Sequence, residues 1–436
     1  MIRRSNLLSI LVALCIAAGS FNVAAAPMRA LVIRHVSAFD GENLIRRATV
    51  VVRDGRIVSV GQRARTPGDA EVVNAAGMTL LPGLIDAHTH ETDGRPPLRQ
   101  ALVLGVTTDL EMFTVDPQFP ARMRREQAEG KASDRADLFS SGIGVTAPGG
   151  HGTEFGVPVP TITEPGDAQA FVDARIAEGS DYIKIISERG TARDPFNNLS
   201  ADTLRAVIAA AKRRGKLAVV HVSEQGSALE AIEAGADGLA HVYWVGRPDE
   251  ELALLAKKRG VFVIPTLTVI QSLKGVPSGA ALAADERVAP FLLPDQRDNL
   301  GKASRNPTIG PEDSYAVARD TVRLLHKVGV TILAGSDCPN TGTAQGASLH
   351  RELELLVEAG LTPIEALRAA TSAPADTFHL KDRGRLRPGL RADLLLVRGD
   401  PTQDISATRD IVGVWKEGLA VDREAYRTEL HAGTTP

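Results

Sequence analysis

Two histidines close a run of mostly apolar residues in the first quarter of the chain. Residues 81–87 are apolar apart from Asp86, and His88 and His90 follow them. In a β-strand, side chains two residues apart point to the same side. Two imidazoles that leave one strand end side by side can bind one metal ion together. The pair therefore predicts a metal site at the end of a buried strand.

Four more residues that can bind metal ions stand on apolar segments farther along the chain. They are Lys184 within 182–186, His221 after 217–220, His241 after 238–240, and Asp337 after 330–335. Each is weak evidence alone, because single histidines are often core residues and an aspartate often caps a helix. Their common position on predicted strands indicates one shared site.

A second, independent argument concerns Lys184. It lies inside an apolar strand-like run, where an unpaired ammonium is costly to bury. Its conversion into an anionic oxygen ligand between two cations would remove that cost. The alternative is a lysine whose stem is buried and whose head reaches the mouth of the fold.

The middle of the chain alternates strand-like and helix-like segments. Residues 201–214 and 228–234 have helical patterns, and each pattern stops at a glycine. Strands are expected near residues 84, 108, 139, 184, 219, 239, 263 and 333. Repeated units of this length favour a parallel sheet, and eight of them predict an α/β fold of the TIM (β/α)8 barrel type. Barrel active sites lie at the carboxyl ends of the strands, where the candidate ligands stand. Residues 266–311 are expected to form a helical excursion or lid over that mouth.

Both chain ends are rich in β-forming residues. Residues 49–52 and 56–60 flank Asp54-Gly55, a strong hairpin signal, and 392–397 and 411–415 are also strand-like. Two such ends around a different middle predict one small β-sandwich built from both termini. The predicted organisation is a signal peptide (1–26), the N-terminal part of the sandwich (27–80), the barrel (81–384) and the C-terminal part of the sandwich (385–436).

The N-terminus has the pattern of a secretory signal. Arg3 and Arg4 precede an apolar stretch from Leu7 to Ala18, which is too short to span a bilayer, and small residues follow at 24–26. We therefore expect a periplasmic or secreted protein, with an uncleaved apolar N-terminus as the alternative. If Cys15 leaves with the signal, Cys338 is the only remaining cysteine, so no intramolecular disulfide can form.

The composition restricts the partners. The 436 residues are 43% hydrophobic and 24% charged, with a net charge of −3. These values are ordinary for a globular protein and give no basic footprint for nucleic acid. No segment after the N-terminal one could span a membrane. The expected partner is a small-molecule substrate, and self-association into a homo-oligomer stays open.

Three motifs in order resemble the amidohydrolase superfamily. They are Leu-Pro-Gly-Leu-Ile-Asp-Ala-His-Thr-His at 81–90, Ala-Gly-Ser-Asp at 334–337 and Gly-Leu-Thr-Pro-Ile-Glu-Ala-Leu at 360–367. The resemblance covers nearly all of the chain after the signal. Within the superfamily it is similar to the two-metal members, in the imidazolonepropionase-like and Xaa-Pro dipeptidase branch.

This resemblance implies a role for each candidate ligand. His88, His90 and Asp337 would hold the more buried ion, His221 and His241 the second, and Lys184, carbamylated by CO₂, would bridge both. Zinc suits imidazole and carboxylate ligands, with manganese or iron as alternatives. Two such ions lower the pKa of a shared water to near 7 and give a hydroxide nucleophile at neutral pH. Asp337 would take the proton and deliver it to the leaving nitrogen.

Two residues are predicted to contact the substrate. His151 lies in a glycine-rich loop, Gly149-Gly150-His151-Gly152, where the backbone can approach a ligand. Tyr243 lies two residues after His241 and is expected to point to the same side. The alternatives are an exposed histidine in a turn and a packed tyrosine. His350 is interpreted as a helix-surface residue and Cys338 as packing.

The sequence therefore favours an exported metal-dependent hydrolase that cleaves an amide bond, in a dipeptide or an N-acyl amino acid. A one-metal deaminase or imidazolonepropionase-type cyclic amide hydrolase is the first alternative. There Glu224, in His221-Val222-Ser223-Glu224, would shuttle protons; Lys184 argues against it, because the resemblance gives those members no bridging lysine. A lactonase or phosphoesterase would use the same metal pair. A non-catalytic binding relative is disfavoured because all six ligands are present.

Overall fold

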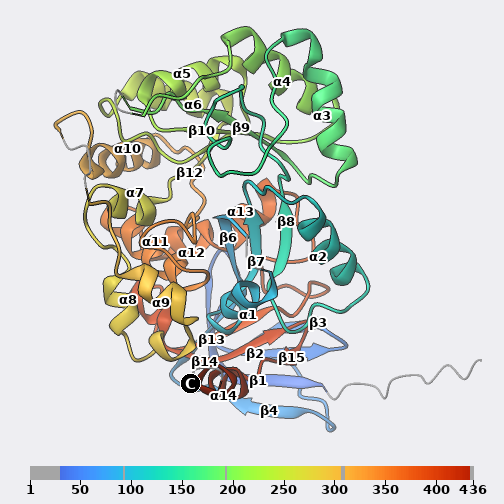
Figure 1. Ribbon diagram of the computed structural model, residues 1–436. Helices are drawn as coiled ribbons and strands as arrows, with labels where there is room; N and C mark the ends of the chain where they lie inside the picture. The colour runs from blue at the N-terminus through green and yellow to red at the C-terminus, as the bar shows by residue number, and fades with distance from the viewer. Residues whose placement is uncertain (1–29, 92–93, 192–193, 306–309, 433–436) are drawn as a thin grey trace, which may run out of the picture.

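The computed structural model describes residues 30–91, 94–191, 194–305 and 310–432. The predicted signal peptide and Cys15 lie outside the described residues. Within these ranges, no helix is both long enough and apolar enough to cross a membrane. The described chain consists of a mixed sheet at one end and an alternation of parallel strands and helices above it (Figure 1).

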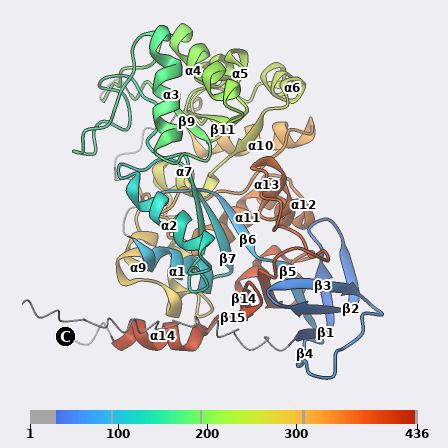
Figure 2. The same ribbon diagram turned by 90° about the vertical axis from the view of Figure 1, so that its right-hand side faces the viewer.

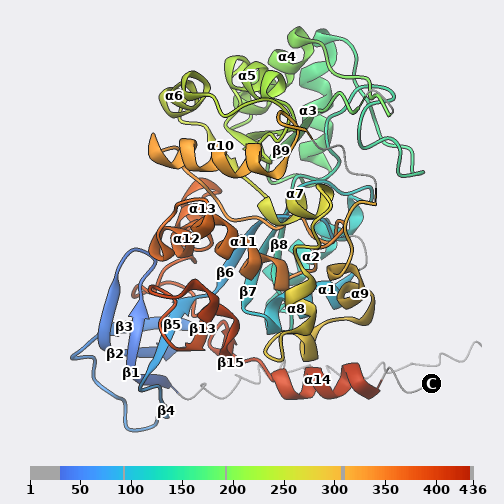
Figure 3. The same ribbon diagram turned by 90° about the vertical axis from the view of Figure 1, so that its left-hand side faces the viewer.

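The mixed sheet combines strands from both chain ends. Its strands are β1 (Leu31–Phe39), β2 (Leu44–Arg53), β3 (Arg56–Gly61), β4 (Glu71–Asn74), β5 (Met78–Pro82), β13 (Leu394–Arg398), β14 (Ile411–Lys416) and β15 (Leu419–Ala420). Their order is β15-β14-β13-β5-β1-β2-β3, and β4 also pairs with β1. We expected a sandwich of two sheets, whereas the hydrogen bonds join all these strands in one. The sheet lies at the opposite end of the molecule from α3–α6 (Figures 2 and 3).

Seven of the eight strands expected in the middle of the chain are present. One parallel sheet contains β6 (Leu84–Thr89), β7 (Val106–Glu111) and β8 (Asp137–Ser140). A second contains β9 (Ile183–Ser187), β10 (Ala218–Val222), β11 (Gly238–Ala240) and β12 (Phe262–Ile264). Nearly all residues of these strands are buried, as is typical of parallel sheets covered by helices, and many of the buried residues in β6, β7 and β8 are polar.

The eighth expected strand, near residue 333, makes only single bridges. Ile332 pairs in parallel with Val263 of β12, and Cys338 pairs in parallel with Thr89 of β6. A further parallel bridge joins Val145, after β8, to β9. Between residues 332 and 338 the ladder is interrupted because Asp337 has a left-handed backbone, with φ 57°. The segment therefore links the two parallel sheets without being a regular strand.

Helices alternate with these strands and cover them. They are α1 (Arg95–Val103), α2 (Gln118–Ala128), α3 (Ala168–Ala177), α4 (Ala201–Arg213), α5 (Gln225–Ala234), α6 (Glu250–Arg259), α7 (Leu267–Leu273), α8 (Ala280–Ala284), α9 (Pro294–Leu300), α10 (Tyr315–Lys327), α11 (Ala347–Glu358), α12 (Pro363–Ala369), α13 (Ser372–Thr377) and α14 (Arg423–Ala432). The Ser200 hydroxyl caps α4, and Gly235 ends α5 in the left-handed conformation. The described part of 266–311 holds the short helices α7, α8 and α9, so this segment is a helical excursion.

A buried ionic cluster fastens the mixed sheet to the parallel strands. The Asp137 carboxylate on β8 forms ion pairs with three cations. They are Lys416 of β14 at 2.8 Å, Arg383 at 2.7 Å and Arg391 at 2.6 Å. Burial alone would raise the pKa of Asp137, but the three cations hold that pKa well below its usual value. The carboxylate is therefore charged, and the cluster joins parts of the chain that are far apart in sequence.

Candidate metal centre

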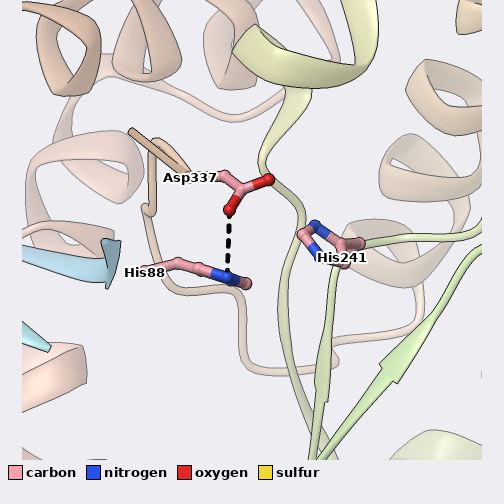
Figure 4. Close-up of side chains that lie close together, drawn as sticks. All are labelled: His88, His241 and Asp337. Carbon is pink, nitrogen blue, oxygen red and sulfur yellow. Dashed lines mark ion pairs between the residues drawn. The ribbon is translucent and has the colours of Figure 1, made fainter. Parts of the chain in front are cut away.

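The six predicted ligands are brought to one place at the carboxyl ends of the parallel strands. Asp337 Oδ1 lies 3.2 Å from His88 Nε2 and 2.9 Å from His90 Nε2. His241 faces them, with its ring centroid 4.7 Å from that of His88 (Figure 4). Ligand atoms of His88, His241 and Asp337 all lie within 4.8 Å of one another. This spacing is compatible with a shared cation.

A second pair of ligand atoms faces the same space. His221 Nδ1 lies 3.1 Å from His241 Nε2. Burial lowers the pKa of His221 to about 4 and that of His241 well below its usual value. Both rings are therefore neutral at neutral pH, which is the form that binds metals.

The ring nitrogens that face away from this space have acceptors. His90 Nδ1 donates to the Phe113 carbonyl at 3.1 Å, and His241 Nδ1 lies 2.6 Å from Thr266 Oγ1. Such outer contacts fix the tautomer, so that the other ring nitrogen carries the lone pair. His88 Nδ1 has no hydrogen-bond partner although the residue is fully buried, and its Nε2 has the contact with Asp337.

Asp86 holds the two ligand-bearing segments against each other. Its carboxylate accepts hydrogen bonds from the His88 amide at 3.1 Å, the Ser336 amide at 3.0 Å and the Ser336 hydroxyl at 2.6 Å. The Asp337 amide donates to the His88 carbonyl at 2.7 Å. Burial raises the pKa of Asp86 to about 7. The relative position of His88 and Asp337 is therefore fixed by contacts with the backbone of both segments.

Lys184 lies on β9 beside this group and is 1% exposed. Burial lowers its pKa from 10.5 to about 7, against the opposing effects of Asp337 and Glu111. A large fraction of Lys184 is therefore an uncharged amine near neutral pH. Only the neutral amine is nucleophilic, so the environment favours a covalent reaction at this nitrogen.

The donor set fits divalent metal ions. Neutral imidazoles and a carboxylate converge on one space, and buried lone pairs there have no hydrogen-bond donor. His221 and His241 each have a partner for the ring nitrogen that faces away from this space. The two nitrogens that face each other therefore need not carry protons. Two lone pairs at 3.1 Å repel each other unless a proton or a cation lies between them. Imidazole and carboxylate together are ligands of zinc and related transition metals.

Two adjoining cavities open onto the metal centre. The first, of about 400 Å³, has an apolar wall formed by Phe113, Val115, Phe155, Ile186 and Pro339. The second, of about 370 Å³, is more mixed and is lined by Glu188, Trp244, Leu273, Lys274 and Asp313, among others. His151, His221, His241, Asp337 and Asn340 line both. The metal centre thus lies between two compartments of a size suited to small molecules.

Comparison with known proteins decides the family. Residues 98–421 match the model of the amidohydrolase family, well over half of the chain. The chain belongs to the amidohydrolase family. It is 26% identical to an ochratoxinase from Aspergillus niger, over 87% of this chain and 83% of that protein. It is 25% identical to an imidazolonepropionase from Deinococcus deserti, over 86% and 92% of the two chains.

A solved structure shows the same fold. A Xaa-Pro dipeptidase with methionine bound in its active site superposes with a TM-score of 0.71, at 22% identity, over 90% of this chain and 99% of that one. This amidohydrolase is therefore a metal-dependent hydrolase of amide bonds in small molecules. The predicted membership of the imidazolonepropionase-like and dipeptidase branch is confirmed.

The two predicted substrate contacts of this amidohydrolase differ in position. His151 lines both cavities, with its ring centroid 5.1 Å from that of His221. Tyr243 does not line either cavity. It is 1% exposed, and its hydroxyl donates to the Arg247 carbonyl at 2.9 Å. The structure thus places the Tyr243 hydroxyl against the Arg247 carbonyl, and the neighbouring Trp244 lines the second cavity.

Two glutamates close to His221 have different positions. Glu224 stands just before α5 and pairs with Arg189 at 3.6 Å, and it lines neither cavity. Glu188, which the sequence interpretation missed, is the carboxylate that contacts His221. Its position four residues after Lys184, at the end of the same strand, was the available signal.

Two further predictions concern residues near the site. His350 is not a helix-surface residue, because it is fully buried and bonded to Thr408 and the Leu104 carbonyl. Cys338 is buried, and burial raises the pKa of its thiol well above its usual value. A thiol in that state is a poor nucleophile, in agreement with the packing role expected for it.

Proposed function

We propose that this chain is an exported hydrolase with two divalent ions that cleaves the amide bond of a dipeptide or an N-acyl amino acid. The observation that carries the proposal is the convergence of neutral, inward-facing imidazoles on Asp337 beside a buried lysine of lowered pKa. The export part depends on the basic and apolar pattern of residues 1–26. We also infer a closed eight-stranded barrel, supported by the single parallel bridges between the two sheets.

The residues divide into two ligand sets. His88, His90 and Asp337 would hold one ion, and His221 and His241 the other. Lys184 would bridge them as a carbamate, formed when its neutral amine adds to CO₂ and releases one proton. Zinc suits this donor set best. When bound, such ions lower the pKa of water towards 7 and act as Lewis acids on a carbonyl oxygen.

Asp337 is the residue proposed to move the proton. It lines both cavities and lies on the interrupted segment after the eighth expected strand. A carboxylate there can accept a proton from the attacking water and later donate it to the leaving nitrogen, because the two steps occur in sequence. His151, which also lines both cavities, is proposed to contact the substrate beside the scissile bond.

The cavities support an amide with unlike groups on its two sides. The first cavity presents Phe113 and Phe155, so an apolar group fits there. Phe155 is 56% exposed although its ring centroid lies 6.2 Å from that of Phe113, so much of this aromatic ring remains open to an apolar group of the substrate. The second cavity offers hydroxyl and charged groups for a polar moiety. Dipeptides and N-acyl amino acids have this form.

The test is the metal content of the protein, measured by elemental analysis after expression with zinc and bicarbonate. About two ions per chain are expected, and fewer in Lys184→Ala. A screen of dipeptides and N-acyl amino acids, read as released amine, then identifies the substrate. One ion per chain that Lys184→Ala leaves in place contradicts the bridged pair. Turnover of lactones or phosphoesters with no turnover of amides contradicts the substrate class.

A further inference from the structure

Glu188 continues the face of β9 that carries Lys184. Residues 184, 186 and 188 are spaced by two along an extended chain, and all three line the cavities at the metal centre. Glu188 Oε2 lies 3.4 Å from His221 Nε2, the ring nitrogen opposite to the one that faces His241. Glu188 therefore contacts the predicted ligand His221 on the side of the ring that faces away from His241.

The carboxylate of Glu188 is held in place by other groups. The Gly190 amide donates to Oε1 at 2.6 Å, and the Ser223 side chain also hydrogen-bonds to it. The residue is thus an oriented acceptor and not a mobile side chain.

Other histidines of the site have neutral acceptors behind them. The Phe113 carbonyl serves His90, and the Thr266 hydroxyl serves His241. Among the contacts described for these three ligands, His221 alone has a carboxylate behind it. A carboxylate acceptor fixes the tautomer and raises the basicity of the ligating nitrogen more than a neutral acceptor does.

We propose that Glu188 is the positioning residue of His221, which holds the Nε2 proton so that Nδ1 presents its lone pair to the second metal ion. This inference rests on the proposed two-metal function and goes beyond it, because Glu188 is not itself one of the six ligands. The proposed role is selective. Glu188 strengthens the binding of the ion at His221 and His241. It leaves the binding of the ion at His88, His90 and Asp337 largely unchanged.

Glu224 provides a matched control. It is also a glutamate close to His221 in sequence, but it pairs with Arg189 and lies outside both cavities. Glu188→Gln keeps the size of the side chain and removes the charge, whereas Glu188→Ala removes the contact. Glu224→Gln makes the same chemical change without touching a ligand.

The experiment compares the full chain with these variants by titration of zinc against a chelating dye. In Glu188→Gln we expect the site of His221 and His241 to lose about 10- to 100-fold in affinity, with a larger loss in Glu188→Ala. Glu224→Gln should bind both ions as the unchanged protein does. The visible absorption of the cobalt-substituted protein should change in both Glu188 variants and not in Glu224→Gln, because it reports the ligand field of His221.

A double variant separates a direct effect from a general loss of structure. In a His221→Asn background, Glu188→Gln should cause no further loss of affinity, because its contact is already absent. Equal zinc affinities and cobalt spectra in Glu188→Gln and the unchanged protein would overturn the proposal. A loss that persists in full in the His221→Asn background would also overturn it. If the unchanged protein binds no second ion, the proposed function itself fails.

Discussion

Replacement of Lys184 by methionine should stabilise the metal-free protein while it removes activity. The Lys184 side chain is buried, and burial lowers its pKa to about 7. Folding of the metal-free chain must therefore remove an ammonium from water or leave it without its proton. Methionine has a similar length and no charge, so it fills the same space without that cost.

The magnitude follows from the two pKa values. A folded-state pKa of about 7 against 10.5 in the unfolded chain corresponds to about 4 kcal/mol of lost stability at pH 7. The sign is that of a lowered lysine pKa: the loss is complete below pH 7 and shrinks as pH rises towards 10.5. The stability gain of Lys184→Met should therefore be large at pH 7 and nearly absent above pH 10.5.

The assay is urea unfolding of chelator-treated protein at pH 7 and at pH 10, with Lys381→Met as the control. Lys381 is exposed, so its replacement should change stability by no more than about 0.5 kcal/mol at either pH. With zinc and bicarbonate present, the unchanged protein should regain the stability that it lacks without them. If metal-free Lys184→Met is no more stable than the metal-free unchanged protein at pH 7, the reasoning about this lysine is refuted.

Four further predictions concern other parts of the molecule. Asp337→Asn should reduce kcat below detection in an amide-hydrolysis assay while the circular dichroism spectrum stays native; near-normal kcat would exclude the proton role. Phe155→Ala should raise KM for amides with a bulky apolar group several-fold more than for those with a methyl group, and an equal rise for both would remove Phe155 from recognition. Tyr243→Phe should leave KM unchanged and lower stability by about 1 kcal/mol, because it loses the hydrogen bond from the buried hydroxyl to the Arg247 carbonyl. Asp137→Asn should lower the free energy of unfolding by about 3–5 kcal/mol, since it removes the buried charge that three cations share; if the loss is as small as that of a surface ion pair, the cluster does not fasten the sheet.

The ligand positions were accessible from the sequence because they obey local rules. Apolar runs that end in histidine or aspartate mark buried strand ends, and the fold collects those ends in one place. The same alternation rule failed one step later, at Tyr243. His241 has a left-handed backbone, with φ 71°, so the side chains after it no longer alternate as they would in an extended strand. No residue near position 241 is of a type that indicates a left-handed backbone.

The pairing of strands that are distant in sequence was the other feature that could not be predicted. The β-rich chain ends were evident, but the sequence does not say which strands share hydrogen bonds, and a sandwich was expected where one sheet exists. The proposed role of Glu188 likewise depends on where β10 places His221 and where the residue after β10, Ser223, lies. Contacts of this kind arise from the packing of segments that are distant in sequence.

The pairing of β5 with β13 determines the order in which the molecule can be completed. Residues 78–82 lie against residues 394–398, and β1 lies on the other side of β5. The first sheet to leave the ribosome thus has an open edge until almost the whole chain has been made. Contacts of such sequence separation form late, because they close a very long loop. A chain that crosses a membrane in the unfolded state benefits from this delay, since its N-terminal strands cannot complete their sheet before the C-terminal strands arrive.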